Sequence, residues 1–420
     1  MRRLLSLFLA LLLALSLAAC GAEPEAEAPA PPAEVTAPEP PPPEPEPEPE
    51  PEPYIISDPT AMPAGGTRDG VTYVEYKGIV EHLFFHPVIA YPELAFDGDH
   101  MSDGYDDWMV TVGEYNKILQ SIYDNGYVLV DIHDCWSEQP DENGQPHMVK
   151  NTLYLPEGKK PLIISYDDVN YNLYTLEDGF THKLILGEDG KIWSWGLDPA
   201  GEEVVSRDLD AITILDKFVE EHPDFSPFGA KGCLSITGYE GILGYRTQTD
   251  RENWTEEREA NRQKEIEAVK PVIEELKRTG WTFGSHTWGH ISLNSRTYEV
   301  VTADMQKWFD EVGSLVGEAS VLFYPFGGRL DGDDVRQTGP AFQWMQEQGF
   351  RIFCSVGIES WSKSKSDISA VICDRLHPDG TTLRSSKSLE RYMKFYDARE
   401  IIDLESRPER AVGWLETATT

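Results

Sequence analysis

The sequence predicts an α/β fold, a distorted (β/α) barrel of about seven strands with an inserted β-hairpin. Short apolar runs of strand type alternate along the chain with longer segments in which apolar residues recur at helical spacing. This alternation favours a parallel sheet covered by helices over an all-β sandwich. In such barrels the chemistry lies at the carboxyl ends of the strands, so the polar residues that follow the apolar runs are the candidate site.

Each element has a local reason. Thr111 and Glu114 form a capping box, and the apolar stripe behind them predicts a helix between the strands at 83–85 and 126–132. Residues 161–166 (PLIISY) are an unbroken apolar run, which is typical of a parallel strand buried on both faces. Helices are further predicted at 208–221, 258–279 with Pro271 inside, 303–316 and 340–348, and strands at 232–237, 281–283, 321–324, 350–354 and 370–373.

The segment 176–205 interrupts this rhythm. Residues 182–195 read as two short strands around Gly187-Glu188-Asp189-Gly190, which predicts the inserted β-hairpin. We expect it above the face where the strands end.

The composition limits the function. The chain has 420 residues, of which 40% are hydrophobic, enough for one large or two ordinary domains with a sizeable core. Its formal net charge is −37, and such a field repels phosphate backbones, so we expect no binding of nucleic acid. Ten glutamates of this surplus lie in 21–53; without them and without Arg2 and Arg3, residues 54–420 still carry −29.

The N-terminus predicts export. Arg2 and Arg3 precede an apolar run from Leu4 to Leu17, which is too short to span a membrane comfortably and ends in Ala18-Ala19-Cys20. Residues 1–20 resemble a bacterial lipoprotein signal peptide, which implies lipidation of Cys20 and an extracytoplasmic protein anchored to the cell membrane. An ordinary secretory signal that contains a cysteine is the alternative.

Residues 21–53 are almost only Ala, Glu and Pro, which predicts a disordered, extended and solvated tether between the anchor and a domain at 54–420. A proline-rich docking ligand is the alternative for this segment.

Two pairs of polar residues follow predicted strands. Asp167 and Asp168 end the 161–166 run, where one carboxylate can face a metal and the other a water molecule. Alone the signal is weak, because Asp106-Asp107 and Asp333-Asp334 also occur and a solvated pair is the default in a chain with 73 acidic residues. His286 and His290 follow the 281–283 strand at a spacing of four, which across one helical turn places both imidazoles on one side, where they can share a cation.

A second histidine pair, His82 and His86, has the same spacing but lies in or beside a strand. There the two residues are about 13 Å apart, so they cannot easily bind one ion.

These motifs carry a resemblance. Asp167-Asp168, His286-Thr287-Trp288-Gly289-His290 and Tyr324-Pro325-Phe326-Gly327 occur in the order of the polysaccharide deacetylase family, carbohydrate esterase family four. The resemblance covers about 76–400, including His86. It implies a hydrolase that depends on one divalent metal, with zinc the first choice and cobalt, nickel or manganese as alternatives, and that removes N-acetyl groups from an amino-sugar polysaccharide or cell-wall glycan.

The resemblance also assigns roles. The metal ligands would be Asp168, His286 and His290, and Asp167 would be the general base. The backbone N–H of Phe326 would stabilise the oxyanion, and Tyr324 would contact substrate. Trp288, which stands between the two histidines in the sequence, is a separate candidate for contact with a sugar ring. His377 in Leu376-His377-Pro378 matches the family's general acid, although the stretch also reads as a plain exit from a strand into a turn.

The chain departs from the family pattern in three respects. Phe323 stands where the family has an arginine that orients the base, and Arg329 or Arg375 could substitute for it. Val169 stands where a glycine usually follows the aspartate pair, and the family's fourth motif, which contains an aspartate, is not found. Two alternatives therefore stay open, a non-catalytic envelope lipoprotein that binds glycans or a partner and a metal-dependent amidase with a non-sugar substrate.

Further expectations concern assembly and cysteines. The partners implied are an N-acetylated glycan and the membrane, and the chain is expected to be a monomer. Cys135, Cys233, Cys354 and Cys373 show no metal-binding spacing, and buried thiols are as plausible as a bridge.

Overall fold

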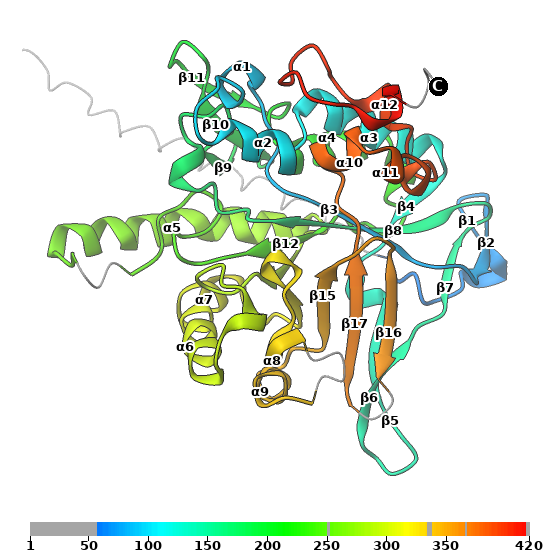
Figure 1. Ribbon diagram of the computed structural model, residues 1–420. Helices are drawn as coiled ribbons and strands as arrows, with labels where there is room; N and C mark the ends of the chain where they lie inside the picture. The colour runs from blue at the N-terminus through cyan, green and yellow to red at the C-terminus, as the bar shows by residue number, and fades with distance from the viewer. Residues whose placement is uncertain (1–56, 250–252, 334–337, 366–367, 417–420) are drawn as a thin grey trace, which may run out of the picture. The chain divides into compact units, whose positions relative to one another are not determined.

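A computed structural model of the chain describes residues 57–249, 253–333, 338–365 and 368–416 (Figure 1). The predicted signal peptide (1–20), with Cys20, and the predicted tether (21–53) lie outside the described residues. None of the described helices combines the length and the apolar character needed to cross a membrane.

The main sheet is a nearly closed, distorted barrel, which confirms the predicted fold class. Seven of its strands follow one another around the ring in the order β3-β8-β12-β13-β14-β15-β17, and all of these pairings are parallel. The strands are β3 (Glu81–Phe85), β8 (Lys160–Asp167), β12 (Cys233–Ile236), β13 (Thr282–Ser285), β14 (Val321–Phe323), β15 (Ile352–Val356) and β17 (Ala370–Arg375).

The ring closes just beyond the end of β17. There the N–H of Phe84 donates to the carbonyl of Leu376 (2.9 Å), and the N–H of Leu376 donates to the carbonyl of His82 (3.0 Å). Along its own length β17 instead pairs with the antiparallel strand β16 (Trp361–Lys365), which occupies the edge that β3 would need. The barrel is therefore closed only at the carboxyl ends of its strands. A further strand, β4 (Tyr127–Leu129), pairs briefly with β8.

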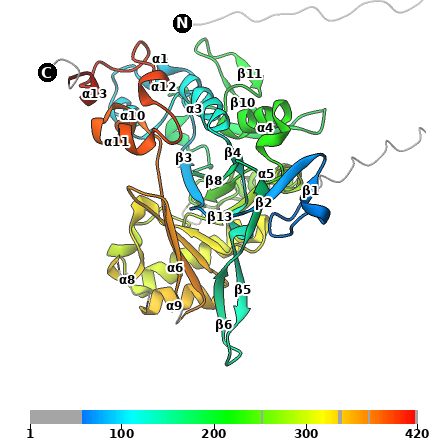
Figure 2. The same cartoon turned by 90° about the vertical axis from the view of Figure 1, so that its right-hand side faces the viewer.

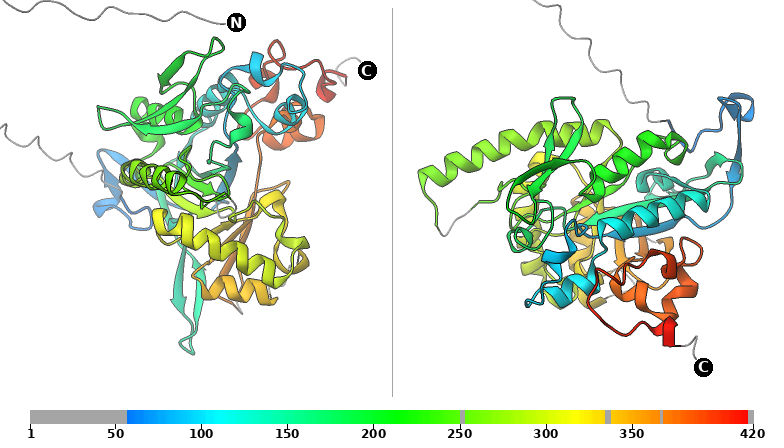
Figure 3. Two further views of the ribbon diagram at one scale, coloured as in Figure 1. Left: turned by 90° about the vertical axis from the view of Figure 1, so that its left-hand side faces the viewer. Right: turned by 90° about the horizontal axis from the view of Figure 1, so that it is seen from above.

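Helices connect the strands of the ring as the βα pattern predicts. The helices between consecutive strands are α3 (Val112–Asp124), α4 (Ala211–Glu221), α5 (Glu256–Arg278), α6 (Tyr298–Trp308) and α9 (Pro340–Glu347). The capping box of Thr111 and Glu114 begins α3, and Pro271 lies inside α5. Figure 3 shows α5 running along one side of the barrel, while α6 and α9 pack against each other below it.

Strand alternation divides the core into two parts. Side chains such as Ile163, Phe323 and Cys354 form one buried cluster, and their sequence neighbours Ile164, Leu322 and Phe353 belong to another that includes the helices. Because successive side chains of a strand point to opposite faces, the first cluster fills the barrel and the second lies between barrel and helices.

In the part of the chain that the structure describes, three smaller sheets lie outside the ring. The predicted hairpin is confirmed as β9 (Lys183–Leu186) and β10 (Ile192–Leu197), and β11 (Glu203–Ser206) extends it to three strands. The other two sheets, which the sequence analysis does not predict, are β1 (Thr67–Arg68), β2 (Val71–Tyr76) with β7 (Leu153–Pro156), and β5 (Trp136–Pro140) with β6 (Pro146–Lys150). Figure 2 shows the β5–β6 hairpin projecting away from the barrel.

Some predicted boundaries are wrong. The strand predicted at 126–132 ends at Leu129, because Asp131 caps a 3-10 turn over Ile132–Cys135 by accepting from the N–H of His133. The helix predicted at 303–316 begins at Tyr298 and includes a π-helical turn, Phe309–Gly313, before α7 (Ser314–Val316).

The C-terminal region folds back over the carboxyl ends of the strands. Its helices are α10 (Gly380–Arg384), α11 (Ser386–Tyr392), α12 (Ala398–Ile401) and α13 (Gly413–Glu416). Arg407 is buried and donates to both Asp106 and Glu114, and Arg384 also donates to Asp106. Asp106 is therefore fully buried in an ion cluster, so solvation, the default interpretation of the Asp106-Asp107 pair, is wrong for Asp106.

Candidate active site

Three predicted ligands meet where the strands end. Asp168 directly follows β8, and His286 directly follows β13, two strands further around the ring. One candidate ligand atom from each of Asp168, His286 and His290 lies within 4.8 Å of the other two. The fold thus brings Asp168 next to two histidines that follow it by more than one hundred residues in the sequence. The metal-binding role of the three residues stays a prediction.

The cluster fits a divalent cation by its chemistry. Two imidazoles and one carboxylate are the donor set of zinc sites that retain open positions, and the same donors suit cobalt, nickel and manganese. Oδ1 of Asp168 is buried without a hydrogen-bond partner. Nδ1 of His286 lies 2.9 Å from the carbonyl oxygen of Phe323, so this nitrogen donates and Nε2 keeps its lone pair for a ligand. Burial also lowers the pKa of His286, which favours the neutral imidazole.

The histidine motif is a loop and not a helical turn, so the helical spacing argument is wrong. Thr287 and His290 both have left-handed backbone conformations, with φ of 63° and 49°. The carboxylate of Asp304, on α6, accepts from the N–H of Trp288 (2.8 Å) and of Gly289 (2.9 Å). These bonds offset the cost of the strained backbone and hold the two histidines at a fixed separation.

Asp167 is paired with a buried guanidinium. Arg375, at the end of β17, donates to both carboxylate oxygens of Asp167 at 2.8 and 2.9 Å, and it is fully buried. Burial is the largest single influence and would raise the pKa of Asp167. The charge and hydrogen bonds of Arg375, together with the nearby His286 and His86, outweigh burial and hold this pKa well below its usual range. Asp167 is therefore a charged carboxylate of fixed orientation.

The same arrangement explains one departure from the family pattern. The guanidinium of Arg375 lies between the rings of Phe84 and Phe323, at 4.1 and 4.6 Å from their centroids. Of the two arginines that could substitute, Arg329 instead pairs with Asp374. Phe323 thus contributes an aromatic face to an arginine that a different strand supplies.

His377 belongs to a chain of hydrogen-bonding groups beside the cluster. Its Nδ1 lies 2.9 Å from Oδ2 of Asp379, and its Nε2 lies 3.0 Å from Nδ1 of His86. The ring of His377 stacks on Phe84 at a centroid distance of 4.3 Å. Burial, and then the neighbouring His377, lower the pKa of His86 to about 4, so His86 is neutral at physiological pH.

A cavity of about 370 Å³ joins these groups. It is lined by Phe84, His86, Trp108, Met109, Asp167, Asp168, His286, His290, Tyr324, Phe326, Val356 and His377. Tyr324 is fully buried, and its hydroxyl has no partner in the described part of the chain. Phe326 has a left-handed backbone (φ 57°), and its side chain is 74% exposed at the cavity rim beside His290.

Trp288 is placed differently from the other predicted residues. Its indole N–H donates to Glu311, the ammonium of Lys307 lies over its ring, and it is not part of the cavity lining. The hairpin β9–β10 also contributes no lining residue. The exposed tryptophan in the lining is Trp108, at the end of α2 (Ser102–Trp108).

The sequence analysis does not identify three residues that shape the site. Asp304 is an ordinary acidic residue of a helix by its local pattern, and Trp108 follows an acidic stretch without a motif. Asp379 does carry a signal: it caps α10 by accepting from the N–H of Thr382, so the turn reading of this stretch is correct. The other oxygen of Asp379 faces His377, and only the fold shows this second contact.

Comparison with known proteins gives a partial match. Residues 252–339 match the family model described as polysaccharide deacetylase, a segment that includes His286, His290 and Tyr324 to Gly327. No curated protein matches the sequence. Among solved structures, the chain is similar to the Streptococcus pyogenes deacetylase PplD in complex with acetate, at 15% identity and a TM-score of 0.39, over 77% of this chain and 99% of that one. It is also similar to BC0361, a polysaccharide deacetylase from Bacillus cereus, at 14% identity and a TM-score of 0.41, over 77% and 69% of the two chains.

The buried pair of Asp167 and Arg375 predicts a large stability effect. Arg375→Gln leaves a buried carboxylate without its partner, so we expect the free energy of unfolding to fall by about 3–5 kcal/mol. Urea denaturation followed by circular dichroism measures this. Lys270→Gln, which breaks an exposed pair with Glu267, is the control and should cost less than about 1 kcal/mol. Equal losses in the two variants would contradict the assignment.

The contacts of Asp304 predict an effect on metal affinity. Asp304→Ala removes the acceptors of two N–H groups between His286 and His290, so we expect divalent metal to bind about 10–100-fold more weakly. A zinc titration against a competing chelator measures the affinity, and circular dichroism checks that the variant is folded. The control is Asp310→Ala, an exposed residue just after α6. Unchanged affinity in Asp304→Ala would show that the loop holds its shape without these bonds.

Proposed function

We propose that this protein is a metal-dependent hydrolase that removes N-acetyl groups from an amino-sugar polysaccharide or cell-wall glycan. The observation that carries the proposal is the convergence of Asp168, His286 and His290 with a charged carboxylate, Asp167, and an oriented imidazole, His377, around one cavity. The family match over 252–339 supports it, because that segment includes both histidines.

The chain's residues divide the reaction between two sides of the cavity. Asp168, His286 and His290 would hold the cation, which when bound supplies Lewis acidity to a water molecule and to the acetyl carbonyl. Asp167 takes the proton of the attacking water, and Arg375 keeps this carboxylate charged and aimed at the cavity. The backbone N–H of Phe326 is the proposed donor to the oxygen that becomes negative.

His377 completes the reaction as the general acid. The amine leaving group needs a proton, and His377 lines the cavity on the side of His86 and Phe84. Asp379 accepts from Nδ1 of His377, which fixes the orientation of the ring. This arrangement supports the catalytic role of His377, because the turn at Asp379 also places a carboxylate oxygen against Nδ1 of the ring.

The cavity suits a sugar with a small acyl group. Its volume lies at the lower end of small-molecule sites, so one acetamido group and part of a ring fit inside while the rest of the polymer stays outside. Trp108 and Phe326 are exposed at 54% and 74% and offer faces for pyranose rings at the rim. Residues 54–420 carry a net charge of −29. This charge does not repel an acetylated glycan, because such a glycan is neutral.

The alternative of a non-catalytic glycan-binding lipoprotein rests on Val169, on the missing fourth motif and on the departure at Phe323, where the family has an arginine. Arg375 supplies a guanidinium to Asp167, so this departure no longer argues against catalysis. A binding protein also has no chemical need for an ion-paired base next to three metal ligands.

Two variants test the catalytic proposal in the full chain. Asp167→Asn keeps the three ligands and should keep bound metal while losing acetate release from peptidoglycan and N-acetylglucosamine oligomers by a factor of about 100 or more. His286→Ala removes a ligand and should lose both metal and activity. Metal content by mass spectrometry and an enzymatic acetate assay are the measurements.

The outcomes separate the alternatives. Metal binding without acetate release from any glycan would overturn the deacetylase proposal, and full activity in Asp167→Asn would remove the base assignment. His222→Ala is a matched control, because His222 lies at the end of α4 and is not part of the cavity lining, and it should keep metal and activity.

We further propose that the protein is a monomeric, extracytoplasmic lipoprotein held on the cell membrane through Cys20, with 21–53 as its tether. The leader and the composition of the tether support this. Cys20→Ala should move the protein out of the membrane fraction of a bacterial host, as judged by immunoblotting. Full retention of this variant in the membrane fraction would overturn the lipid anchor.

A further inference from the structure

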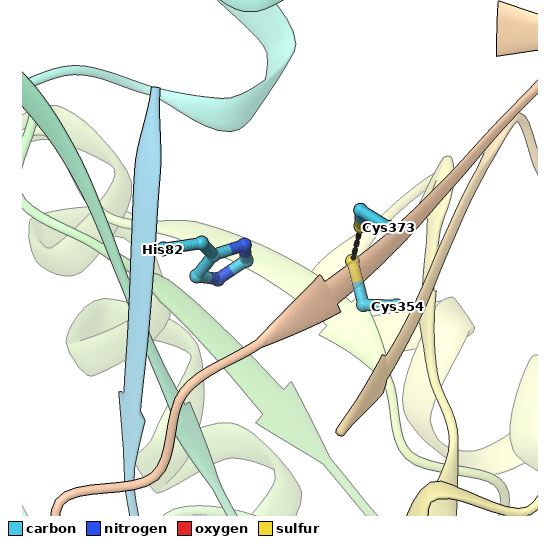
Figure 4. A group of neighbouring side chains, drawn as sticks. All are labelled: His82, Cys354 and Cys373. Atoms are coloured by element: carbon cyan, nitrogen blue, oxygen red, sulfur yellow. Dashed lines mark hydrogen bonds between the residues drawn. The ribbon is translucent and has the colours of Figure 1, made fainter. Parts of the chain in front are cut away.

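Two cysteines face each other inside the barrel. Cys354 on β15 and Cys373 on β17 are direct partners in the parallel register of the two strands. Their Sγ atoms lie 3.0 Å apart, and both side chains are buried in the cluster that fills the barrel (Figure 4). The two residues are 19 positions apart in the sequence, and no motif links them.

The placement suits a disulfide. Neighbouring strands lie about 4.8 Å apart, within the range of about 4.4–6.8 Å between the Cα atoms of disulfide-bonded residues. The two side chains emerge on the same face of the sheet and toward each other. An S–S bond of about 2.05 Å needs the sulfurs to approach by only about 1 Å more.

A metal site is the other chemistry that these residues could support. His82 lies beside the two thiols, and one ligand atom from each of the three residues lies within 4.8 Å of the others. However, a tetrahedral zinc site with Zn–S bonds of 2.3 Å places two sulfurs about 3.8 Å apart. Nε2 of His82 lies 2.9 Å from the hydroxyl of Ser165, and the same hydroxyl accepts a hydrogen bond from Arg375. The positive charge of Arg375 is therefore close to His82 and disfavours a metal ion there. The geometry therefore favours a disulfide over a metal.

We propose that Cys354 and Cys373 form a disulfide bond in the mature protein. The proposal rests on the proposed export, because oxidising compartments are where structural disulfides form and persist. Two protein thiols react with a small-molecule or enzyme disulfide; one S–S bond forms in the protein, the oxidant's S–S bond breaks, and the oxidant leaves as two thiols. Since both residues are buried, the bond forms before or while the barrel closes around them.

The bond would lie directly behind the base of the candidate active site. Arg375 is two residues beyond Cys373 on β17, so both side chains point into the barrel. Nε of Arg375 also lies 3.4 Å from the carbonyl of Ser355, the residue after Cys354. A covalent link between β15 and β17 therefore fixes the register of the strand that presents Arg375 and, just beyond it, His377.

Peptide mapping of the full chain tests the proposal. The protein is expressed with its leader in a bacterial host, purified without reductant, unfolded in urea, refolded in a mixture of reduced and oxidised glutathione, then denatured with iodoacetamide present and digested. We expect a peptide pair linked through Cys354 and Cys373, with Cys135 and Cys233 alkylated. After reduction all four should be alkylated, and the thermal midpoint should fall by about 4 °C, a shift that Cys354→Ser and Cys373→Ser should lack.

The control is Cys135→Ser, which should keep the linked peptide because Cys135 contacts the carbonyl of Asp131 rather than another thiol. Four alkylated thiols in the wild-type protein after oxidised glutathione would overturn the proposal. A second bound zinc ion that is lost in Cys354→Ser would also overturn it and indicate the metal site. If the serine variants fail to fold, the wild-type map alone decides. Because mapping needs no activity, a failed acetate assay does not affect this test.

Discussion

The ion pair between Asp167 and Arg375 is the constraint on which the rest of the site depends. A charged carboxylate cannot stay inside a barrel without a partner, and here a fully buried guanidinium binds both of its oxygens. The partner is in turn held between Phe84 and Phe323 and by the carbonyl of Ser355. Four strands of the ring thus contribute to the position of one carboxylate. The orientation of the candidate base therefore depends on the closure of the barrel.

The barrel closes at only one of its two ends. The ring joins β3 to the residues after β17, while β16 occupies the remaining edge of that strand. The result is a barrel that is complete only at the end that carries Asp168, His286 and His377. The C-terminal region covers this end, and its Arg407 ties α2, which carries Trp108, to the capping box of α3 through Asp106 and Glu114. Distant parts of the chain therefore set the rim of the cavity by buried charges.

The position of Arg375 illustrates how a buried carboxylate can find its charged partner on a different strand. A guanidinium beside Asp167 fixes the carboxylate whichever strand supplies it. In this chain the guanidinium comes from β17, and the position on β14 holds Phe323, whose ring packs on it. The same interior face of β15 and β17 carries Cys354 and Cys373, so the layer beneath the arginine is where a covalent link would stabilise it most directly.

The sequence alone determined the alternation of strands and helices and the inserted hairpin, because these depend on local periodicity. The resemblance of its short motifs to a known family also singled out candidate site residues, which are Asp167, Asp168, His286, His290 and His377. The sequence could not decide that Arg375 rather than Arg329 pairs with Asp167, that Asp304 shapes the histidine loop, or that Asp379 faces His377. It also could not show that Trp288 turns away from the cavity while Trp108 lines it. These contacts join residues that are far apart in the chain, and only the register and closure of the barrel bring them within hydrogen-bonding distance.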